Sequence, residues 1–203
     1  MEIKKEIFAI FPTPIYVSIL NRNLNKKELT TINKLKKNKN KGNIVSENSY
    51  VLELPIFDNL KKELNIFIKD YFKNILTSND NVEPYITQSW INYTKENQFH
   101  HEHKHPNSLV SGVLYINADD ENDSIKFYKD NYQQIELIPK QWNLFTSTLW
   151  WFAVKTKNIF LFPSFLKHSV DIKKGTNTRI SLAFNVFIKG SIGIEKELNK
   201  LIL

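Results

Sequence analysis

The sequence is constrained most by a change of pattern near Asp80. Beyond that residue, short runs rich in β-branched and aromatic residues alternate with turn residues, as is typical of β-strands. Before it, apolar residues recur at helical spacing. Helices first and many strands afterwards predict an α+β domain, in which antiparallel sheets carry the site and the helices cover one face. We expect six to eight strands, drawn mainly from residues 85–94, 108–117, 124–129, 145–154, 158–163 and 178–188.

The two ends of the chain predict simple elements. Residues 7–19 contain Pro12 and Pro14 and predict an edge strand, because proline is tolerated at the edge of a sheet but not at its centre. Residues 195–203 predict a short terminal helix.

Two helices are expected between these elements and the strands. Residues 25–37 combine charged residues with an apolar side, and a polar exit containing Gly42 follows. After Pro55 the apolar residues follow a helical stripe as far as Ile75, which predicts a scaffold helix laid on the core.

Length and composition limit the class of protein. A chain of 203 residues with 41% hydrophobic residues has the size of one domain and enough apolar surface for one core. The sequence has no cysteine, which excludes disulfides, thiol nucleophiles, cysteine-ligated zinc and iron–sulfur clusters. A metal ion would need histidine or carboxylate ligands.

The charge of +7 comes from lysine, since Arg22 and Arg179 are the only arginines. Lysine occurs together with abundant asparagine and isoleucine, so we interpret the charge as a solvated surface and do not expect nucleic-acid binding. The apolar run at residues 7–10 is too short for a signal peptide, and no run reaches the roughly 20 residues of a membrane span. We therefore expect an intracellular, cytoplasmic protein with no membrane partner.

The five histidines are the main candidates for chemistry, since four lie in the run FHHEHKHP and the fifth is His168. In an extended strand, residues i and i+2 share a face, so His103 and His105 can reach one metal ion. Pro106 favours an extended His105, and His168 is the remaining histidine that could complete a facial site. The alternatives are a surface tract that binds metal adventitiously and a core role for His168. Other pairings within the tract are His101 with His103 and His100 with Glu102.

Arg179 lies in a strand whose two faces differ. Arg179, Ser181, Ala183 and Asn185 share one face, and the residues between them are apolar. A buried arginine is costly unless it meets an anion, and its planar fork suits a carboxylate. One face of this strand is therefore expected to pack in a core and the other to line a polar pocket.

Taken together, these motifs resemble the iron(II)- and 2-oxoglutarate-dependent oxygenase superfamily, and more narrowly the 2-oxoglutarate–Fe(II) oxygenase family found in marine bacteria and their phages. The resemblance covers about residues 88–187, and the N-terminal phrase FPTPIY also resembles the opening strand of that family. Five motifs match in order, namely SW at Ser89–Trp90, HKHP at His103–Pro106, SGVLY at Ser111–Tyr115, FPSFLKH at Phe162–His168 and RISLAFN at Arg179–Asn185.

The resemblance implies a double-stranded β-helix, or jelly roll, similar to that of prolyl-hydroxylase-like enzymes. The whole chain, 1–203, would then be a single domain, with an N-terminal strand and supporting helices over 1–80 and a jelly-roll catalytic core over 85–190.

The resemblance also implies a set of site residues. His103, His105 and His168 would ligate Fe(II), whereas Arg179 and Ser181 would bind the distal carboxylate of 2-oxoglutarate. Tyr115 would either donate to the same carboxylate or serve as a core aromatic. One of Asn92 and Tyr93 would face the pocket, and the choice between them stays open. Trp150 and Trp151 are candidates for the pocket wall or for the core.

The implied activity is a dioxygenase reaction that uses Fe(II), 2-oxoglutarate, dioxygen and an unknown primary substrate, and releases succinate and CO2. His105 departs from the superfamily pattern, in which the second ligand is a carboxylate, and it leaves the ferrous site one unit more positive. The alternative is a cupin-like three-histidine metal protein that does not use 2-oxoglutarate, against which Arg179 and Ser181 argue. Apolar strand faces could also close on a second copy of the chain, so a homodimer is kept beside a monomer.

Overall fold

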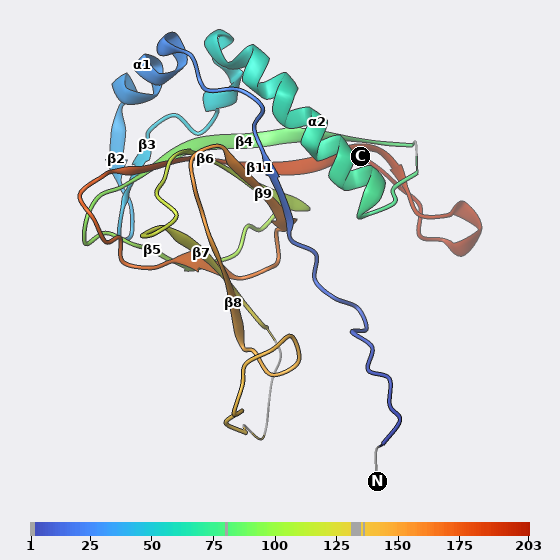
Figure 1. Ribbon diagram of the computed structural model, residues 1–203. Coiled ribbons are helices and arrows are strands. Elements are labelled where there is room, and N and C mark those ends of the chain that lie inside the picture. Colours follow the sequence, from blue (N-terminus) through green and yellow to red (C-terminus); the bar gives the residue numbers. More distant parts are fainter. Residues whose placement is uncertain (1–2, 80, 131–134, 136) are drawn as a thin grey trace.

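The computed structural model describes residues 3–79, 81–130, 135 and 137–203, and it consists of two facing antiparallel sheets with two helices on the outside (Figure 1). The expected α+β class with a double-stranded β-helix core is confirmed. The major sheet has the order β1-β9-β6-β11-β4-β3-β2, with β12 paired to β11, and the minor sheet has the order β5-β10-β7-β8. The strands of the major sheet are β1 (Tyr16–Ile19), β2 (Lys37–Lys39), β3 (Ile44–Ser46), β4 (Val82–Thr94), β6 (Val110–Asn117), β9 (Asn158–Pro163), β11 (Arg179–Ile192) and β12 (Leu201–Ile202). The strands of the minor sheet are β5 (His100–His103), β7 (Ser124–Tyr128), β8 (Leu149–Ala153) and β10 (His168–Val170).

The helices form where the sequence predicts them. Helix α1 (Lys26–Lys34) begins at Asn25, whose side chain accepts the backbone N–H of Glu28, while the Glu28 carboxylate accepts the N–H of Asn25. This reciprocal capping satisfies two N–H groups at the start of the helix. Helix α2 (Asp58–Asn74) lies across β4 and β11 in Figure 1, and two short 3-10 helices, η1 (Val51–Glu53) and η2 (Pro55–Phe57), precede it.

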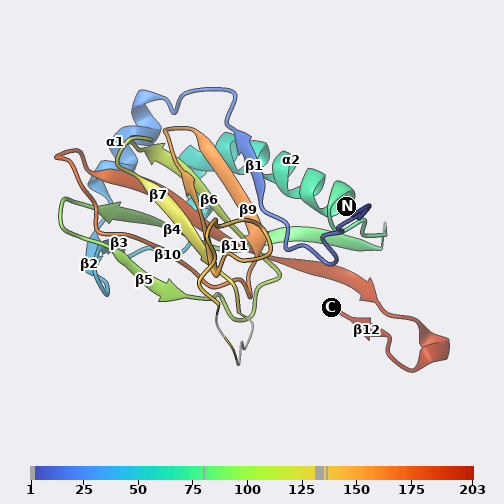
Figure 2. The ribbon, with the colours of Figure 1, turned by 60° about the horizontal axis from the view of Figure 1, so that its bottom comes forward.

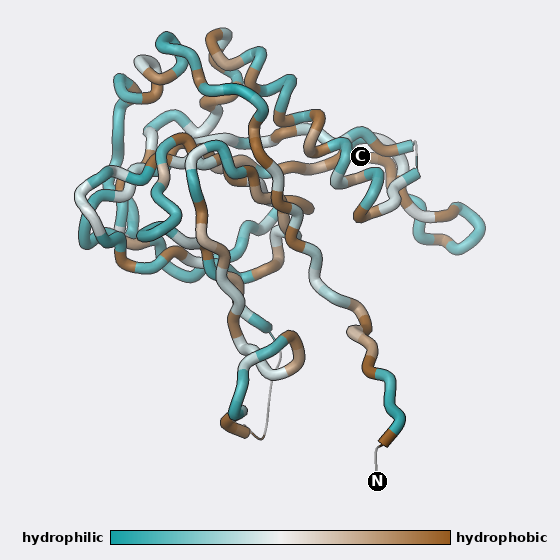
Figure 3. The backbone as a smooth tube through the Cα atoms, viewed as in Figure 1, coloured by the Kyte–Doolittle hydropathy of each residue, from teal (hydrophilic) through white to brown (hydrophobic). Residues whose placement is uncertain are grey.

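Two apolar clusters occupy opposite sides of the major sheet. The larger one joins α2, through residues such as Leu64 and Ile68, to the outer side chains of β4, β6, β9 and β11. The smaller one lies between the two sheets and includes Phe127 of β7 and Phe162 of β9. Figure 3 shows apolar and polar residues alternating along α2 and the strands, as expected where one face packs on an apolar core and the other meets polar groups or solvent.

The expected edge strand is confirmed only at its end, because β1 begins at Tyr16 and residues 7–15 form no strand. The polar exit around Gly42 is a hairpin of β2 and β3, which Gly42 turns with a φ of 93°. A left-handed φ of this kind favours glycine.

The predicted terminal helix is wrong. Residues Glu195–Glu197 form only a 3-10 turn, η3, and β12 then pairs back onto β11. Figure 2 shows this hairpin extending beyond the sheets. From β4 to β12 the described residues contain nine strands, more than expected, because β5, β10 and β12 are too short to show a periodic pattern. None of the described helices has the length and apolarity needed to cross a membrane.

Candidate active site

The candidate site is a pocket between the two sheets, at the polar inner face of β4, β6 and β11. Side chains that alternate along these strands line it, among them Trp90, Asn92 and Thr94 of β4 and Arg179, Ser181 and Ala183 of β11. Four histidines line the opposite wall, namely His100, His103, His105 and His168. The intervening residues of β11, including Leu182 and Phe184, pack in the outer core. The predicted division of this strand into an apolar and a polar face is therefore confirmed.

Strand pairing brings His103 and His168 together. They occupy directly opposed positions of the antiparallel strands β5 and β10, and their ring centroids are 4.2 Å apart. Opposed residues of an antiparallel pair project side by side from the same face. Two residues separated by 65 positions thus become neighbours through register alone.

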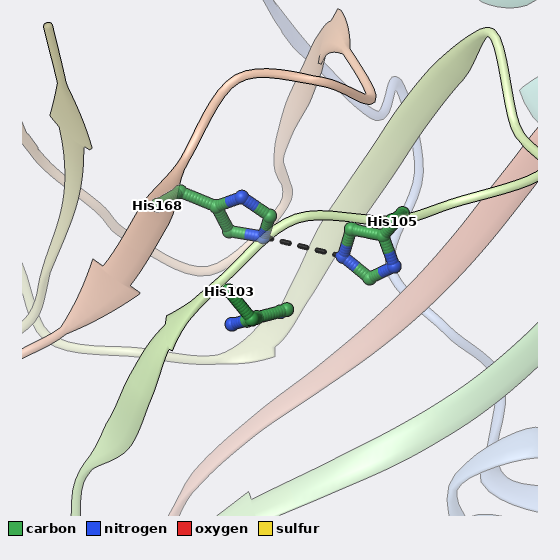
Figure 4. A group of neighbouring side chains, drawn as sticks. All are labelled: His103, His105 and His168. Carbon is green, nitrogen blue, oxygen red and sulfur yellow. Dashed lines mark hydrogen bonds between the residues drawn. The ribbon is translucent and has the colours of Figure 1, made fainter. Parts of the chain in front are cut away.

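His105 reaches the same point by a different route. Strand β5 ends at His103, so the pleat of a strand does not set the orientation of His105. Instead, its backbone N–H donates to the carbonyl of Ser164 at 3.0 Å, which anchors it to the segment after β9. Its Nε2 lies 3.3 Å from Nε2 of His168, and Figure 4 shows the three imidazoles converging.

The geometry fits one metal ion. One nitrogen from each of His103, His105 and His168 lies within 4.8 Å of the others, and no other such group occurs among the described residues. Two imidazole nitrogens about 2.1 Å from an ion and at right angles to each other are about 3.0 Å apart. The observed 3.3 Å between His105 and His168 is close to that separation.

The hydrogen bonds also leave the appropriate nitrogens free. Nδ1 of His103 lies 2.8 Å from the carbonyl oxygen of His101, and Nδ1 of His168 lies 3.0 Å from that of Leu166. A carbonyl only accepts, so both Nδ1 atoms carry the proton and both Nε2 atoms have a lone pair to offer.

Burial keeps the cluster uncharged at neutral pH. Desolvation, followed by the neighbouring His103, lowers the pKa of His105 to about 4 and holds the pKa of His168 well below its ordinary value. Desolvation also lowers the pKa of His103, although its hydrogen bond to His101 opposes the shift. Neutral imidazoles are the form that binds a metal ion.

The structure disfavours the other pairings within the tract. Glu102 is exposed and forms an ion pair with Lys167 at 3.2 Å, away from the convergent nitrogens. His101 Nδ1 lies 3.3 Å from the carbonyl oxygen of Lys41. His100 does line the pocket and stacks on His103 at 4.4 Å, and burial lowers its pKa to about 3.

Arg179 is buried, and it already has one anionic neighbour that the sequence analysis did not identify. Its Nη1 lies 3.3 Å from Oδ1 of Asp123, and the same oxygen lies 3.2 Å from Nζ of Lys173. All three side chains are almost fully buried. Asp123 supplies one negative charge against the two positive charges of Lys173 and Arg179, so this group keeps a net positive charge at the pocket. Within the described part of the chain, Nε and Nη2 of Arg179 have no hydrogen-bond partner.

The other predicted residues can be placed in the same way. Ser181 and Tyr115 pair in register across β11 and β6, and both line the pocket. Burial raises the pKa of the Tyr115 phenol well above its ordinary value, so it stays a donor at neutral pH. Its ring also packs in the inner core, so the core role and the pocket position are compatible. Asn92 lines the pocket, whereas Tyr93 belongs to the outer core.

Both expectations for the tryptophans of β8 are wrong. Trp150 is 45% exposed and Trp151 is 58% exposed, and neither lines the pocket. Strand β8 is the edge of the minor sheet, and it reaches away from the two-sheet body (Figure 1). Local apolar character did not reveal that this strand lacks a covering element.

Fold and site together define a double-stranded β-helix protein with a cluster of three histidines that could hold a metal ion and a cationic pocket beside it. Residues 88–185 match the family described as "Putative 2OG-Fe(II) oxygenase". The matched segment, just under half of the chain, is similar to this family of oxidoreductases that use Fe(II) and 2-oxoglutarate.

Solved structures of low sequence identity share the fold. An oxidoreductase of the 2OG-Fe(II) oxygenase family from Burkholderia pseudomallei is 14% identical, with a TM-score of 0.56, and the match covers 84% of this chain and 83% of that one. HygX from Streptomyces hygroscopicus, solved with nickel, 2-oxoglutarate and hygromycin B bound, is 12% identical, with a TM-score of 0.59 and coverage of 86% and 82%. The α-ketoglutarate-dependent epimerase SnoN from nogalamycin biosynthesis is 9% identical, with a TM-score of 0.59 and coverage of 86% and 78%. No curated protein matches the chain.

Proposed function

We propose that this chain oxidises an unidentified primary substrate at an Fe(II) ion held by His103, His105 and His168. The observation that carries the assignment is the convergence of these three neutral imidazoles within reach of one ion, in the pocket that Arg179 also lines. In the reaction, 2-oxoglutarate and dioxygen would be converted to succinate and CO2. The second oxygen atom would enter the substrate as a hydroxyl group. The iron, when bound, supplies the activation of dioxygen that protein side chains cannot provide.

The remaining residues would hold and orient 2-oxoglutarate. Arg179 presents the free part of its guanidinium fork to the distal carboxylate, and Ser181 lies two residues further along the same face of β11. Tyr115 stands across from Ser181 and can donate its phenolic proton. Asp123 fixes one side of the guanidinium and thereby orients the fork. A charge-assisted clamp of this kind in a buried pocket is the strongest way to bind a carboxylate.

The three-histidine ligand set has an electrostatic consequence. Neutral imidazoles leave the full charge of a ferrous ion uncompensated, whereas a carboxylate ligand would remove one unit. The dianionic 2-oxoglutarate would then neutralise the ion when it binds. We therefore expect iron retention to depend more strongly on 2-oxoglutarate than it does at a site with a carboxylate ligand.

The test is an anaerobic titration of the apoprotein with Fe(II) and then 2-oxoglutarate, monitored by the visible charge-transfer band of the iron chelate. A saturable band should appear in the natural protein and should be absent in His168→Ala. In Arg179→Ala, Fe(II) should still bind, and the 2-oxoglutarate concentration at half saturation should rise roughly a hundredfold, as expected for loss of a buried charge-assisted pair. An unchanged requirement for 2-oxoglutarate in Arg179→Ala would contradict the clamp.

The cytoplasmic location and the homodimer remain predictions from the sequence. Cell fractionation and the mass measured in solution test them directly.

A further inference from the structure

A second cavity lies next to the candidate site and has no assigned role. Its volume is about 550 Å³, and it shares only Trp90 and His105 with the pocket described above. Cavities of roughly 300 to 1,000 Å³ are the usual size for small organic ligands. Its other lining residues are Tyr50, Thr87, Gln88, Pro106, Asn107 and Asn185.

The register of β4 and β11 shows how the two cavities are related. Arg179 pairs with Thr94 and Ser181 with Asn92 in the first pocket, Ala183 pairs with Trp90 beside the metal site, and Asn185 pairs with Gln88 in the second cavity. Each step of two residues along a strand advances about 6.7 Å. The second cavity therefore continues the inner face of the sheet past His105, away from the Arg179 end.

Asn185 supplies a fixed hydrogen-bond donor in this cavity. Its side chain is only 8% exposed, and its Oδ1 accepts the hydroxyl of Ser111 at 3.3 Å. Among the described residues its Nδ2 has no partner. Ser111 is held in turn by Ser164 at 2.8 Å, and the carbonyl of Ser164 anchors the backbone of His105. One network thus positions both a candidate metal ligand and the free amide donor.

The lining is polar but carries no formal charge. Apart from the imidazole of His105, its polar groups are hydroxyls and carboxamides, and Trp90 and Tyr50 offer apolar ring surface. This composition contrasts with the net charge of +7 of the chain. Because its lining contains no lysine, arginine or carboxylate to pair with an ionised ligand, such a cavity suits neutral ligands that form hydrogen bonds.

We propose that this cavity binds the primary substrate, and that the substrate is an uncharged polar molecule whose carbonyl or hydroxyl oxygen accepts a hydrogen bond from Nδ2 of Asn185. The proposal rests on the proposed function, because it places the substrate beside an iron ion held by His105. Gln88 of β4 pairs with Asn185 of the neighbouring strand β11, and it offers a second carboxamide to the same ligand. The substrate carbon to be oxidised would lie on the His105 side of that oxygen.

Matched pairs of small probes test the charge preference. The neutral N-acetylglycinamide would be compared with the anionic N-acetylglycine, and methyl glucoside with glucuronate, by saturation-transfer NMR on the Zn(II)-loaded full chain. We expect the neutral member of a pair to bind at least fivefold more tightly than its anionic counterpart. The pair that responds identifies the acceptor as an amide carbonyl or a sugar hydroxyl. Equal binding of neutral and anionic probes, or no binding of any probe, would overturn the proposal.

Two variants locate the binding. Asn185→Ala removes the donor, and Gln88→Ala removes an exposed carboxamide whose loss does not disturb the core. Each variant should lower the affinity for the neutral probe at least threefold. Asn38→Ala, an exposed substitution on β2, should leave this affinity unchanged. Unaltered binding in both cavity variants would refute the assignment even if Asn185→Ala proved unstable.

The iron titration distinguishes failure of this inference from failure of the proposed function. Gln88→Ala should retain the visible band with Fe(II) and 2-oxoglutarate, because Gln88 lies outside the first pocket and outside the Ser111–Ser164 network that anchors His105. If the band forms but the probes show no preference, the cavity proposal falls and the proposed function stands. If the natural protein gives no band, the substrate role falls together with the proposed function, whatever the probes show.

Discussion

The two faces of the major sheet are built from the same strands, β4, β6 and β11, yet they contain opposite kinds of side chain. Leu182 and Phe184 point outward into the core beneath the helices, whereas Arg179 and Ser181 point inward to the pocket. All four side chains are buried. Burial therefore does not distinguish scaffold from site in this protein, whereas the chemistry of what is buried does.

The difference follows from what each face contacts. Apolar side chains of α2 cover the outer face, so each apolar residue there gains stability by leaving water. The inner face contains polar and charged groups whose desolvation must be offset by partners, as Asp123 does for Arg179. We expect substitutions on the outer face to alter mainly stability and those on the inner face to alter mainly binding.

The largest expected effect on stability is that of Leu182→Ala. Leu182 is 1% exposed in the outer core, and its truncation should cost about 2 to 5 kcal/mol in the free energy of unfolding. Urea denaturation measures the loss. The folded fraction should bind 2-oxoglutarate as the natural protein does, and a large change in affinity would show that the two faces are not independent.

Acid should destabilise the metal-free protein, because the histidines of the pocket must be protonated there. The pKa of His105 is about 4 in the folded protein against about 6.5 when unfolded, so the unfolded chain binds more protons between these values. The stability contributed by the neutral imidazole is therefore complete above pH 6.5 and is lost as the pH falls toward 4. At pH 5 the free energy of unfolding is expected to be about 2 kcal/mol lower than at neutral pH from His105 alone.

Thermal unfolding at pH 7.5 and pH 5.0 measures this effect, with the Tm expected to fall by several degrees. Replacing the half-buried His100, whose pKa is about 3, by asparagine should reduce the fall. An equal Tm at both pH values would contradict the burial of neutral histidines.

Gly112→Ala tests how closely β6 and β11 approach each other. A Cβ at Gly112 would lie 2.2 Å from ring atoms of Phe184, which is directly opposite in register. The ring would have to move within a packed core, at a cost of about 1 to 3 kcal/mol. Differential scanning calorimetry should show a lower Tm, and an unchanged Tm would contradict the close approach of the two strands.

Ser181→Ala should have the smallest effect, and it should act on binding rather than on folding. Loss of one neutral hydrogen bond to the 2-oxoglutarate carboxylate corresponds to about 1 kcal/mol, or roughly a fivefold weaker affinity. The anaerobic titration measures it, and the urea midpoint should stay close to that of the natural protein. A variant that binds 2-oxoglutarate normally would remove Ser181 from the clamp.

Much of the scaffold could be predicted because its signals are local. The apolar stripe of α2 and the alternation along β11 are periodic patterns that only one secondary structure can bury. The hairpin at Gly42 and the terminal strand β12 escaped prediction, since segments of two or three residues are too short to show a period. Trp150 shows the opposite error, because an apolar residue in a strand was expected to be covered or to line the site.

The sequence by itself determined the two helices, the long strands, the two-faced character of β11 and the candidate histidines and Arg179, because periodicity and residue chemistry are local properties. Tertiary structure alone decided that His103 and His168 are opposed, that Ser164 anchors His105, and that Asp123 and Lys173 meet beneath Arg179. These contacts join residues between 50 and 65 positions apart. Strand register and backbone hydrogen bonds bring them together, and the spacing of residues along the chain predicts neither of them.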